Sequence, residues 1–350
     1  MTEFTLVHAG RITLASALIA AAGCAAQSMP AAATENAGEA AAGSAGSAPE
    51  AVKQPVSPND AESAALAATT CDGPAPVMKI LDRVNGGVVS PDWSCLQPPV
   101  PPAAVGSAPM QALPFKLRSL TPELIAGVQV DFFLNASTLG APHFSTVFDG
   151  STDTVNIEVP SGQPSLTVLV HGLQREDMSR SIGELREYAL PILKPSEPVQ
   201  GFLLLTAQRR LIVNEVRRAP LMHDDDPAKA FLVSYARDCS GQDVSGARFE
   251  LLDENGALVL SSADEGQPHT SYMQFAIPNP ECTHTSFDQS AWVMINAPVN
   301  AGDAGVTKPY RLRAKGRLVE TDSEPVVFGE SSVEMVAGAV TFVHLAPAKF

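Results

Sequence analysis

Short runs of alternating apolar and polar residues recur along the chain from about residue 106 onward. They include Val128–Phe132, Val155–Val159, Leu166–Val170, Phe249–Leu251, Tyr310–Ala314 and Val340–Phe342. A period of two places successive side chains on opposite faces, which is the pattern of a half-buried β-strand. Turn signals such as Asn255-Gly256 separate the runs, and few helical stretches intervene. The pattern predicts an all-β chain of antiparallel sandwiches rather than helices layered on a parallel sheet.

Two segments have a helical pattern and predict one or two short helices. The first extends from Ile182 to Tyr188 and is ended by Pro191. The second extends from Thr206 to Val216, with Thr206 as its N-terminal cap.

The strand pattern occurs twice along the chain. Three segments of the first copy match three of the second in the same order: Ala126–Val130 with Ser245–Phe249, Asn156–Pro160 with Met294–Pro298, and Leu166–Gly172 with Tyr310–Gly316. A repeat of this length predicts two consecutive sandwiches. We place them at residues 106–222 and 223–350, with the acidic segment His223-Asp224-Asp225-Asp226 as a solvated turn between them.

The second copy resembles a known family. It contains Val244–Gly256, Asn296-Ala297-Pro298, Tyr310–Ala314 and a closing strand from Val340 to Leu345. These residues resemble the carboxypeptidase-regulatory-like domains, and Asp238-Cys239-Ser240-Gly241 is similar to myxobacterial lipoproteins that carry two such modules. The resemblance covers residues 228–347 and, more weakly, 115–175. It implies a prealbumin-like sandwich of seven or eight strands that is generally a non-catalytic module.

The first 24 residues have the pattern of a secretion signal. An apolar run from Ile12 to Ala22 precedes Gly23-Cys24 and is about half the length needed to span a bilayer. The segment resembles the lipobox of bacterial lipoproteins, although Ala21 stands where leucine is usual. It predicts a signal peptide at residues 1–23 and lipid attachment at Cys24. Ordinary cleavage, with Cys24 lost or free, is the alternative. Because Ala25 follows Cys24, the usual sorting signal favours the outer membrane.

Two further segments precede the strands. Residues 24–70 are rich in alanine and poor in large apolar side chains, which predicts a disordered linker. Residues 71–105 contain an Asn85-Gly86 turn and end in a Pro-rich stretch, which predicts a disulfide clasp and a stiff linker.

Four cysteines remain when Cys24 is set aside: Cys71, Cys95, Cys239 and Cys282. An even set is expected to form disulfides in an oxidising compartment. Three connectivities are possible, and proximity in the sequence favours Cys71 with Cys95 and Cys239 with Cys282.

The charge and motifs argue against several classes of function. Lys and Arg number 23 against 38 Asp and Glu, and the net charge of −15 disfavours nucleic acid as a partner. Phosphate-binding loops are absent from the sequence, and Cys282-Thr283-His284 lacks the second ligand pair of a zinc site. We therefore expect no cofactor and no metal.

Leu166–Gly172 resembles the strand and His-Gly loop of α/β-hydrolases. Such enzymes carry a G-x-S-x-G motif further along the chain, and none follows Gly172. His171 is therefore predicted to be an exposed strand residue before a turn.

The sequence predicts a non-enzymatic, lipid-anchored protein of the cell envelope, in which two sandwich modules bind or scaffold a protein or polysaccharide. The alternative is a secreted or tethered hydrolase, or a carbohydrate-binding protein, with a sandwich as an accessory domain.

Overall fold

The computed structural model describes residues 76–82, 87–96, 108–118, 122–207, 209 and 226–347, with gaps at 136, 139, 178–179, 263, 265, 275–276, 280, 287–290 and 300–308. Cys24, Cys71, the Ala-rich segment and most of the acidic turn lie outside the described residues. The predictions made for those positions stay predictions.

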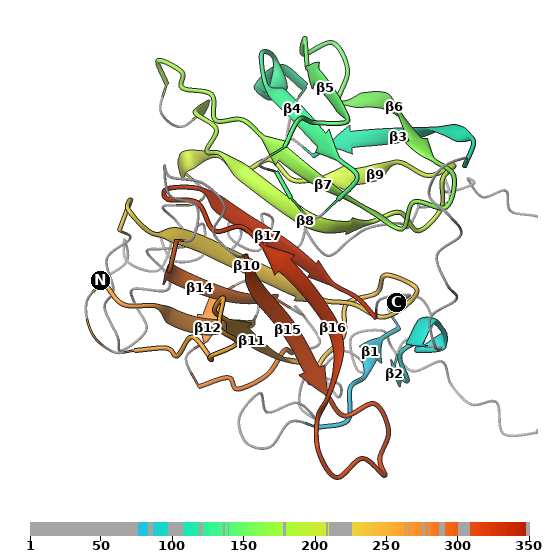
Figure 1. Ribbon diagram of the computed structural model, residues 1–350, viewed down its shortest axis with the longest axis vertical. Coiled ribbons are helices and arrows are strands. Elements are labelled where there is room, and N and C mark those ends of the chain that lie inside the picture. Colours follow the sequence, from blue (N-terminus) through green and yellow to red (C-terminus); the bar gives the residue numbers. More distant parts are fainter. Residues whose placement is uncertain are drawn as a thin grey trace, which may run out of the picture.

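The described chain is almost entirely β-structure, which confirms the predicted fold class (Figure 1). A hairpin, β1 (Ile80–Leu81) and β2 (Val88–Val89), precedes a first sandwich and a second one. The first sandwich contains β3 (Met110–Leu117), β4 (Gln129–Phe133), β5 (Phe144–Val147), β6 (Thr154–Pro160), β7 (Ser165–Val170), β8 (Leu185–Pro191) and β9 (Val199–Gly201). The second contains β10 (Ala230–Ala236), β11 (Arg248–Leu252), β12 (His269–Gln274), β13 (Ile277–Asn279), β14 (Ala291–Ala297), β15 (Tyr310–Gly316), β16 (Val326–Val333) and β17 (Val340–Leu345). Two 3₁₀ turns, Ser94–Leu96 and Pro122–Ile125, also occur. No helix in the described part of the chain is long and apolar enough to cross a bilayer.

The two repeats found in the sequence have corresponding patterns of strand pairing. In the first sandwich, β3 pairs antiparallel with β6 and parallel with β9. In the second, β10 pairs antiparallel with β14 and parallel with β17. The other sheet is β4-β7-β8 in the first copy and β11-β15-β16 in the second. Gly127 and Gly246, which precede β4 and β11, both have a positive φ, of 84° and 80°. The two copies therefore share the pairing of these six strands, whereas β5 extends β4 in the first copy and β12 and β13 extend β14 in the second.

One continuous sheet joins the two sandwiches. Its nine strands have the order β13-β12-β14-β10-β17-β8-β7-β4-β5, and the junction is the parallel pair β8 and β17. The small sheets β6-β3-β9 and β11-β15-β16 each pack against one half of this long sheet (Figure 1). The sequence predicted consecutive sandwiches, and the structure adds that they share a sheet.

The prediction of a helix from Ile182 to Tyr188 is wrong, because most of this segment lies in β8. A register shift between β7 and β8 interrupts the regular alternation of the strand. Buried Leu185 and Tyr188 are consequently three residues apart, a spacing that also suits a helix face. At the second predicted helix, Thr206 begins a helical segment whose remainder lies largely outside the described residues.

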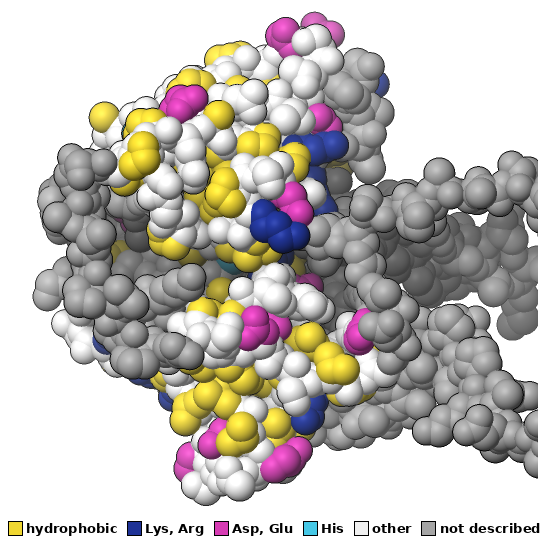
Figure 2. Space-filling model, turned by 90° about the vertical axis from the view of Figure 1, so that its right-hand side faces the viewer, with side chains coloured by type: hydrophobic (Ala, Val, Ile, Leu, Met, Phe, Trp, Pro, Cys, Tyr) yellow, Lys and Arg dark blue, Asp and Glu magenta, His cyan; other side chains and the backbone are white. Residues whose placement is uncertain are grey.

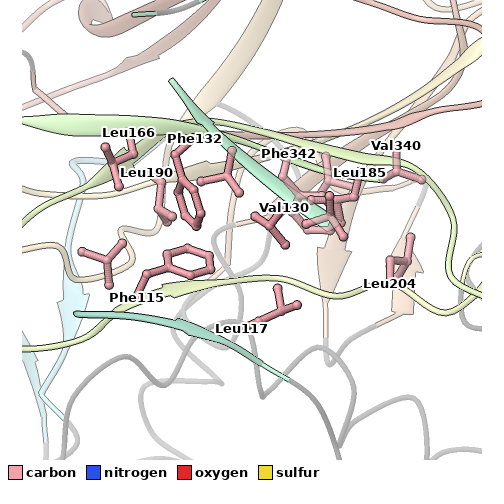
Figure 3. Packing of buried hydrophobic residues seen from close by; sticks show 14 of the residues in the cluster. Phe115, Leu117, Val130, Phe132, Leu166, Leu185, Leu190, Leu204, Val340 and Phe342 are labelled. Atoms are coloured by element: carbon pink, nitrogen blue, oxygen red, sulfur yellow. The ribbon is translucent and has the colours of Figure 1, made fainter. Parts of the chain in front are cut away.

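Two hydrophobic cores lie on opposite sides of the long sheet. In the first core, Phe115 and Phe132 meet edge to face with ring centroids 4.7 Å apart (Figure 3). All residues of β10, β14 and β17 are buried. Phe231 of β10 points into the first core and its neighbour Leu232 into the second. Strands buried on both faces hold the centre of the molecule together.

Polar side chains also connect the two sandwiches. Glu334, 6% exposed, accepts hydrogen bonds from Ser137 Oγ at 2.6 Å, from Thr138 N and Oγ1 at 2.9 and 2.7 Å, and from Tyr188 OH at 3.2 Å. The Arg186 guanidinium lies 3.9 Å from the same carboxylate. These contacts tie the segment after β16 to β8 and to the loop after β4.

Candidate functional site

A cavity of about 520 Å³ lies between the two sandwiches. Its walls come from the start of β7, the end of β8, the middle of β16, the end of β17 and a disulfide. Its volume is typical of ligand sites, which usually have about 300 to 1,000 Å³. We therefore treat this junction cavity as the candidate binding site.

The cavity lies where β8 and β17 stop pairing. Their parallel register ends at Tyr188 and Val343, and the next residue of β8, Ala189, lines the cavity. Ala189 has a φ of 54°, in the left-handed region that disfavours a side chain. The β7–β8 register shifts here, so Ala189 belongs to a β-bulge. Strained bulges are often found next to functional sites, where they redirect the chain.

The opposite wall is a strand edge that has no second partner strand among the described residues. In the order β11-β15-β16, strand β16 has a neighbour on one side only within its sheet. Glu330, Ser331 and Ser332 of β16 line the cavity. A Cβ at the preceding Gly329 would lie 3.0 Å from the carbonyl oxygen of Ala346, which shows how closely β16 passes the end of β17.

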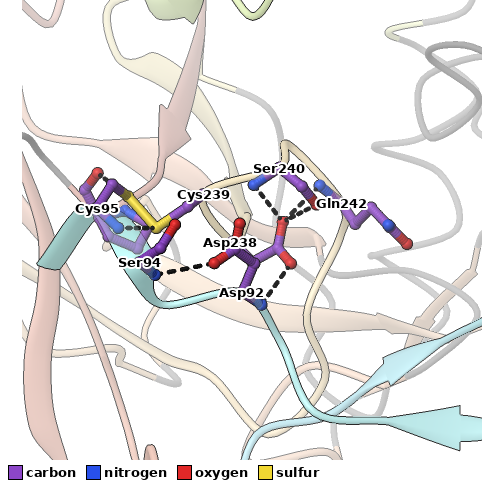
Figure 4. Close-up of a disulfide and its surroundings, with 8 residues drawn as sticks. Asp92, Ser94, Cys95, Asp238, Cys239, Ser240 and Gln242 are labelled. Atoms are coloured by element: carbon purple, nitrogen blue, oxygen red, sulfur yellow. Dashed lines mark hydrogen bonds between the residues drawn. A yellow bond between two sulfur atoms is a disulfide. The ribbon is translucent and has the colours of Figure 1, made fainter.

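A disulfide between Cys95 and Cys239 forms another part of the wall. Next to it, the carboxylate of Asp238 accepts hydrogen bonds from Asp92 N at 2.9 Å, Ser240 N and Oγ at 3.0 and 2.7 Å, and Gln242 N at 2.9 Å (Figure 4). Cys239 N donates back to Asp92 O at 2.9 Å. The disulfide and these bonds together fasten residues 92–95 to the second sandwich.

The predicted pairing of Cys71 with Cys95 and of Cys239 with Cys282 is wrong. The hairpin segment packs Met78 and Ile80 into the second core, and Trp93 lies against Phe328 with ring centroids 5.5 Å apart. This docking brings Cys95 to Cys239, which is 144 residues away in the sequence. Cys282 is also disulfide-bonded.

The lining of the cavity contains few charged groups and few aromatic rings. Among the described residues that line it, none is Lys or Arg, and none is Phe, Tyr or Trp. Asp238 is 1% exposed and uses its oxygens on the loop bonds above. Glu330 lies 3.5 Å from Arg311 and is the more accessible carboxylate. The walls otherwise offer hydroxyls, amides, aliphatic groups, the disulfide and the imidazole of His344. Such a lining does not favour an anion or a stacked ring.

A buried histidine–carboxylate pair lies at the β8–β17 junction, and its histidine, His344, lines the cavity. His344 Nε2 lies 2.6 Å from Glu187 Oε1, and Phe202 N donates to Glu187 Oε2 at 3.0 Å. The His344 ring stacks on Phe202 and Tyr235. Burial, helped by the charge of Arg237, lowers the pKa of His344 despite the neighbouring carboxylate. His344 is therefore neutral and donates from Nε2, while its Nδ1 has no hydrogen-bond partner among the described residues.

His171 lies elsewhere, directly after β7, and does not line the cavity. Its Nε2 is 2.7 Å from Asp131 Oδ2, and its side chain is 38% exposed. Burial opposes ionisation of Asp131, but hydrogen bonds from His171, Ser145 and Gln129 outweigh it and lower the pKa of the carboxyl. Sequence reasoning missed Asp131, although its position on β4 beside the strand of His171 could have suggested the pair.

The other sequence candidate, Cys282-Thr283-His284, is built into the second sandwich. Cys282 is in a disulfide, and His284 is 1% exposed with its Nδ1 3.3 Å from Thr283 Oγ1. Within the described ranges, no group of three or more His, Cys, Asp or Glu side chains could hold a metal ion.

No protein-family model and no curated protein matches the chain. Among solved structures, it is similar to the Bacillus anthracis TIE protein, with 9% identity and a TM-score of 0.18 over 68% of this chain and 34% of that one. It thus spans about a third of the TIE chain. It is also similar to the shaft pilin SpaA from Lactobacillus rhamnosus GG, with 9% identity and a TM-score of 0.19 over 68% of this chain and 98% of that one. The major pilin from Streptococcus pyogenes has 10% identity and a TM-score of 0.18 over 69% and 98%. Superpositions this poor support no inference about function, so the chain's own strands define its class: a protein of two fused β-sandwiches with a cavity at their junction.

Proposed function

We propose that this chain is a lipid-anchored envelope protein that binds a partner without catalysing a reaction. The observation that carries the proposal is the fusion of the two sandwiches through β8 and β17, which holds the walls of the junction cavity in one body. A site on a rigid scaffold loses little conformational entropy on binding, which suits a binding or scaffolding module.

The proposed compartment is supported by the cysteines and the N-terminal segment. Disulfides such as Cys95–Cys239 persist in oxidising compartments. The lipobox-like segment before Cys24 and the alanine after it support a lipid anchor in the outer membrane. The resemblance to carboxypeptidase-regulatory-like domains of myxobacterial lipoproteins belongs to the same proposal, because the two copies share a sandwich topology.

Metabolic labelling with palmitate tests the anchor. We expect label on the wild-type protein and none on Cys24→Ser, because only a cysteine at the cleavage site receives the lipid. Cys71→Ser is the matched control and should stay labelled. Equal labelling of wild type and Cys24→Ser would reject the anchor.

A hydrolase is the second candidate, and the His171–Asp131 pair favours it, because a carboxylate orients the catalytic imidazole of many hydrolases. Turnover of esterase, peptidase or glycosidase substrates that is lost in His171→Ala would establish this alternative and overturn the non-enzymatic role. Absence of turnover across the three substrate classes would remove it.

A further inference from the structure

We infer that the junction cavity binds an extended polypeptide segment, uncharged or basic, which adds as a strand to the free edge of β16. This inference rests on the binding role proposed above and names its partner class. Strand addition supplies affinity through main-chain hydrogen bonds and specificity through pockets for alternate side chains.

The first argument is the edge itself. An edge strand presents unpaired backbone N–H and C=O groups, which seek partners from another chain. In β16, Glu330, Ser331 and Ser332 pair with β15 and also line the cavity. A strand with no second neighbour in its sheet, among the described residues, therefore borders a ligand-sized space.

The wall that faces β16 includes a residue of β8 whose backbone is not part of regular strand pairing. Tyr188 pairs with Val343 of β17, and Leu190 pairs with Leu166 of β7. Ala189 lies between them and has a place in neither register. Its left-handed conformation keeps β8 from continuing alongside β17, so the space between the strands stays open. A segment lying along β16 would thus have, on both sides, backbone groups that are not paired with another strand.

The side chains decide which segment fits. Leu134, Ile192 and Leu193 offer an apolar surface for alternate side chains, while Ser165 and Thr167 offer hydroxyls. The absence of Lys and Arg from the described lining disfavours an acidic segment, and Glu330 favours a basic one. On the face seen in Figure 2, acidic and basic side chains are scattered over both sandwiches.

Two other ligand classes fit less well. A sugar usually stacks on an aromatic ring, and a phosphate or sulfate requires cations or a helix N-terminus. The described lining has no Phe, Tyr, Trp, Lys or Arg, and its one histidine, His344, is only 2% exposed. Backbone amides and carbonyls are the groups that a free strand edge complements best.

The test uses the full-length protein and a fluorescein-labelled pentapeptide, Thr-Val-Lys-Val-Thr, blocked at both ends. We expect a saturable rise in fluorescence anisotropy, and weaker binding when glutamate replaces the central lysine. N-methylation of the peptide at alternate residues separates strand addition from recognition of side chains alone. Methyl groups on the residues that face β16 should weaken binding about tenfold or more, because each removes a donor and blocks the edge. Methyl groups on the intervening residues should have a much smaller effect.

Variants locate the binding. Ser165→Trp fills the cavity and should abolish binding, whereas Val147→Trp, on the exposed edge strand β5 away from the cavity, should leave it unchanged. The methylation series uses the wild-type protein, so its outcome does not depend on the folding of a variant. No binding at millimolar peptide, equal sensitivity to every methyl group, or displacement by a tetrasaccharide of N-acetylglucosamine would overturn the inference. Palmitate labelling is a separate readout, so loss of peptide binding with intact labelling rejects the strand-addition site and leaves the anchor standing.

Discussion

At the scale of single residues, the junction depends on a few buried polar groups. Glu334 receives four hydrogen bonds from the first sandwich, and Glu187 holds His344 across β8 and β17. A buried carboxylate is costly unless its oxygens are satisfied, so these groups stabilise one arrangement of the two sandwiches and penalise others.

Removing Glu334 should therefore destabilise the protein strongly. We expect Glu334→Ala to lower the free energy of unfolding by about 3 kcal/mol, because Thr138, Tyr188 and Arg186 lose a buried partner. Urea denaturation measures the change. Glu320→Ala is the control. The Glu320 side chain is 78% exposed, and its ion pair with Lys79 is long, at 3.9 Å, so its loss should change the free energy of unfolding little. Equal effects of the two substitutions would contradict the role given to Glu334.

His344 should make stability depend on pH in the mildly acidic range. Its pKa is lowered in the folded chain, so the unfolded state binds the proton more readily below about pH 6.5. Stability is then complete above that pH and falls as the pH drops, by at most about 1.4 kcal/mol per unit for this residue. Urea denaturation between pH 7 and 5 should show the decline, and His344→Gln should reduce its slope. An unchanged slope in His344→Gln would mean that the residue is not buried in its neutral form.

Replacing a strand residue by glycine usually lowers stability, but at Ala189, where the backbone is left-handed, we expect no such loss. Glycine adopts this conformation without strain, so Ala189→Gly should be neutral or stabilise the protein by about 1 kcal/mol. Ala112→Gly, at an exposed position in the interior of β3, should cost about 1 kcal/mol. Both values come from thermal or urea unfolding. A cost at residue 189 as large as at residue 112 would contradict the strained bulge.

At the scale of elements, alternation located most of the predicted strands. The alternating runs at β4, β6, β7, β11, β15 and β17 are found where the sequence placed them, and the repeat segment Met294–Pro298 overlaps β14. β10 was not predicted, because burial on both faces removes the alternation. β8 was taken for a helix because its bulge changes the spacing of the buried residues.

The junction cavity could not be predicted from the sequence. Ser165 and Ala189 come from the paired strands β7 and β8, whereas Ser331 comes from β16 of the other sandwich, and none of the three lies in a recognisable motif. Their proximity depends on the parallel pairing of β8 with β17, a contact between the two repeats that neither copy encodes alone. The Cys95–Cys239 bond was missed for a similar reason, because it depends on the docking of a preceding segment onto the second core.

The disulfide connectivity can be checked directly. Peptide mapping without reduction should recover Cys95 linked to Cys239, and neither should be found linked to another cysteine. Replacing both by serine should lower the free energy of unfolding by about 4 kcal/mol, as expected for closure of a loop of more than one hundred residues. A double variant as stable as the oxidised wild type would show that the docked segment needs no covalent bond.

At the scale of the whole molecule, the shared sheet couples the two sandwiches. Residues of β10, β14 and β17 contribute to both cores, so neither half can lose its packing alone. Unfolding should therefore be a single cooperative transition. Trp93 and Trp292 both pack in or against the second core, whereas far-ultraviolet circular dichroism reports on both sandwiches. The two signals should change together in urea, and a second transition seen only by circular dichroism would contradict the coupling.

The bond between Cys95 and Cys239 has a mechanical consequence. The covalent path through the sulfurs bypasses β3–β10, so the first sandwich lies off the shortest covalent route along the chain. Tension along that route would pass from the hairpin segment into the second sandwich and reach the first one through the β8–β17 pair rather than along its own backbone. A molecule tethered by its leading end could then be stretched without straightening the backbone of the first sandwich.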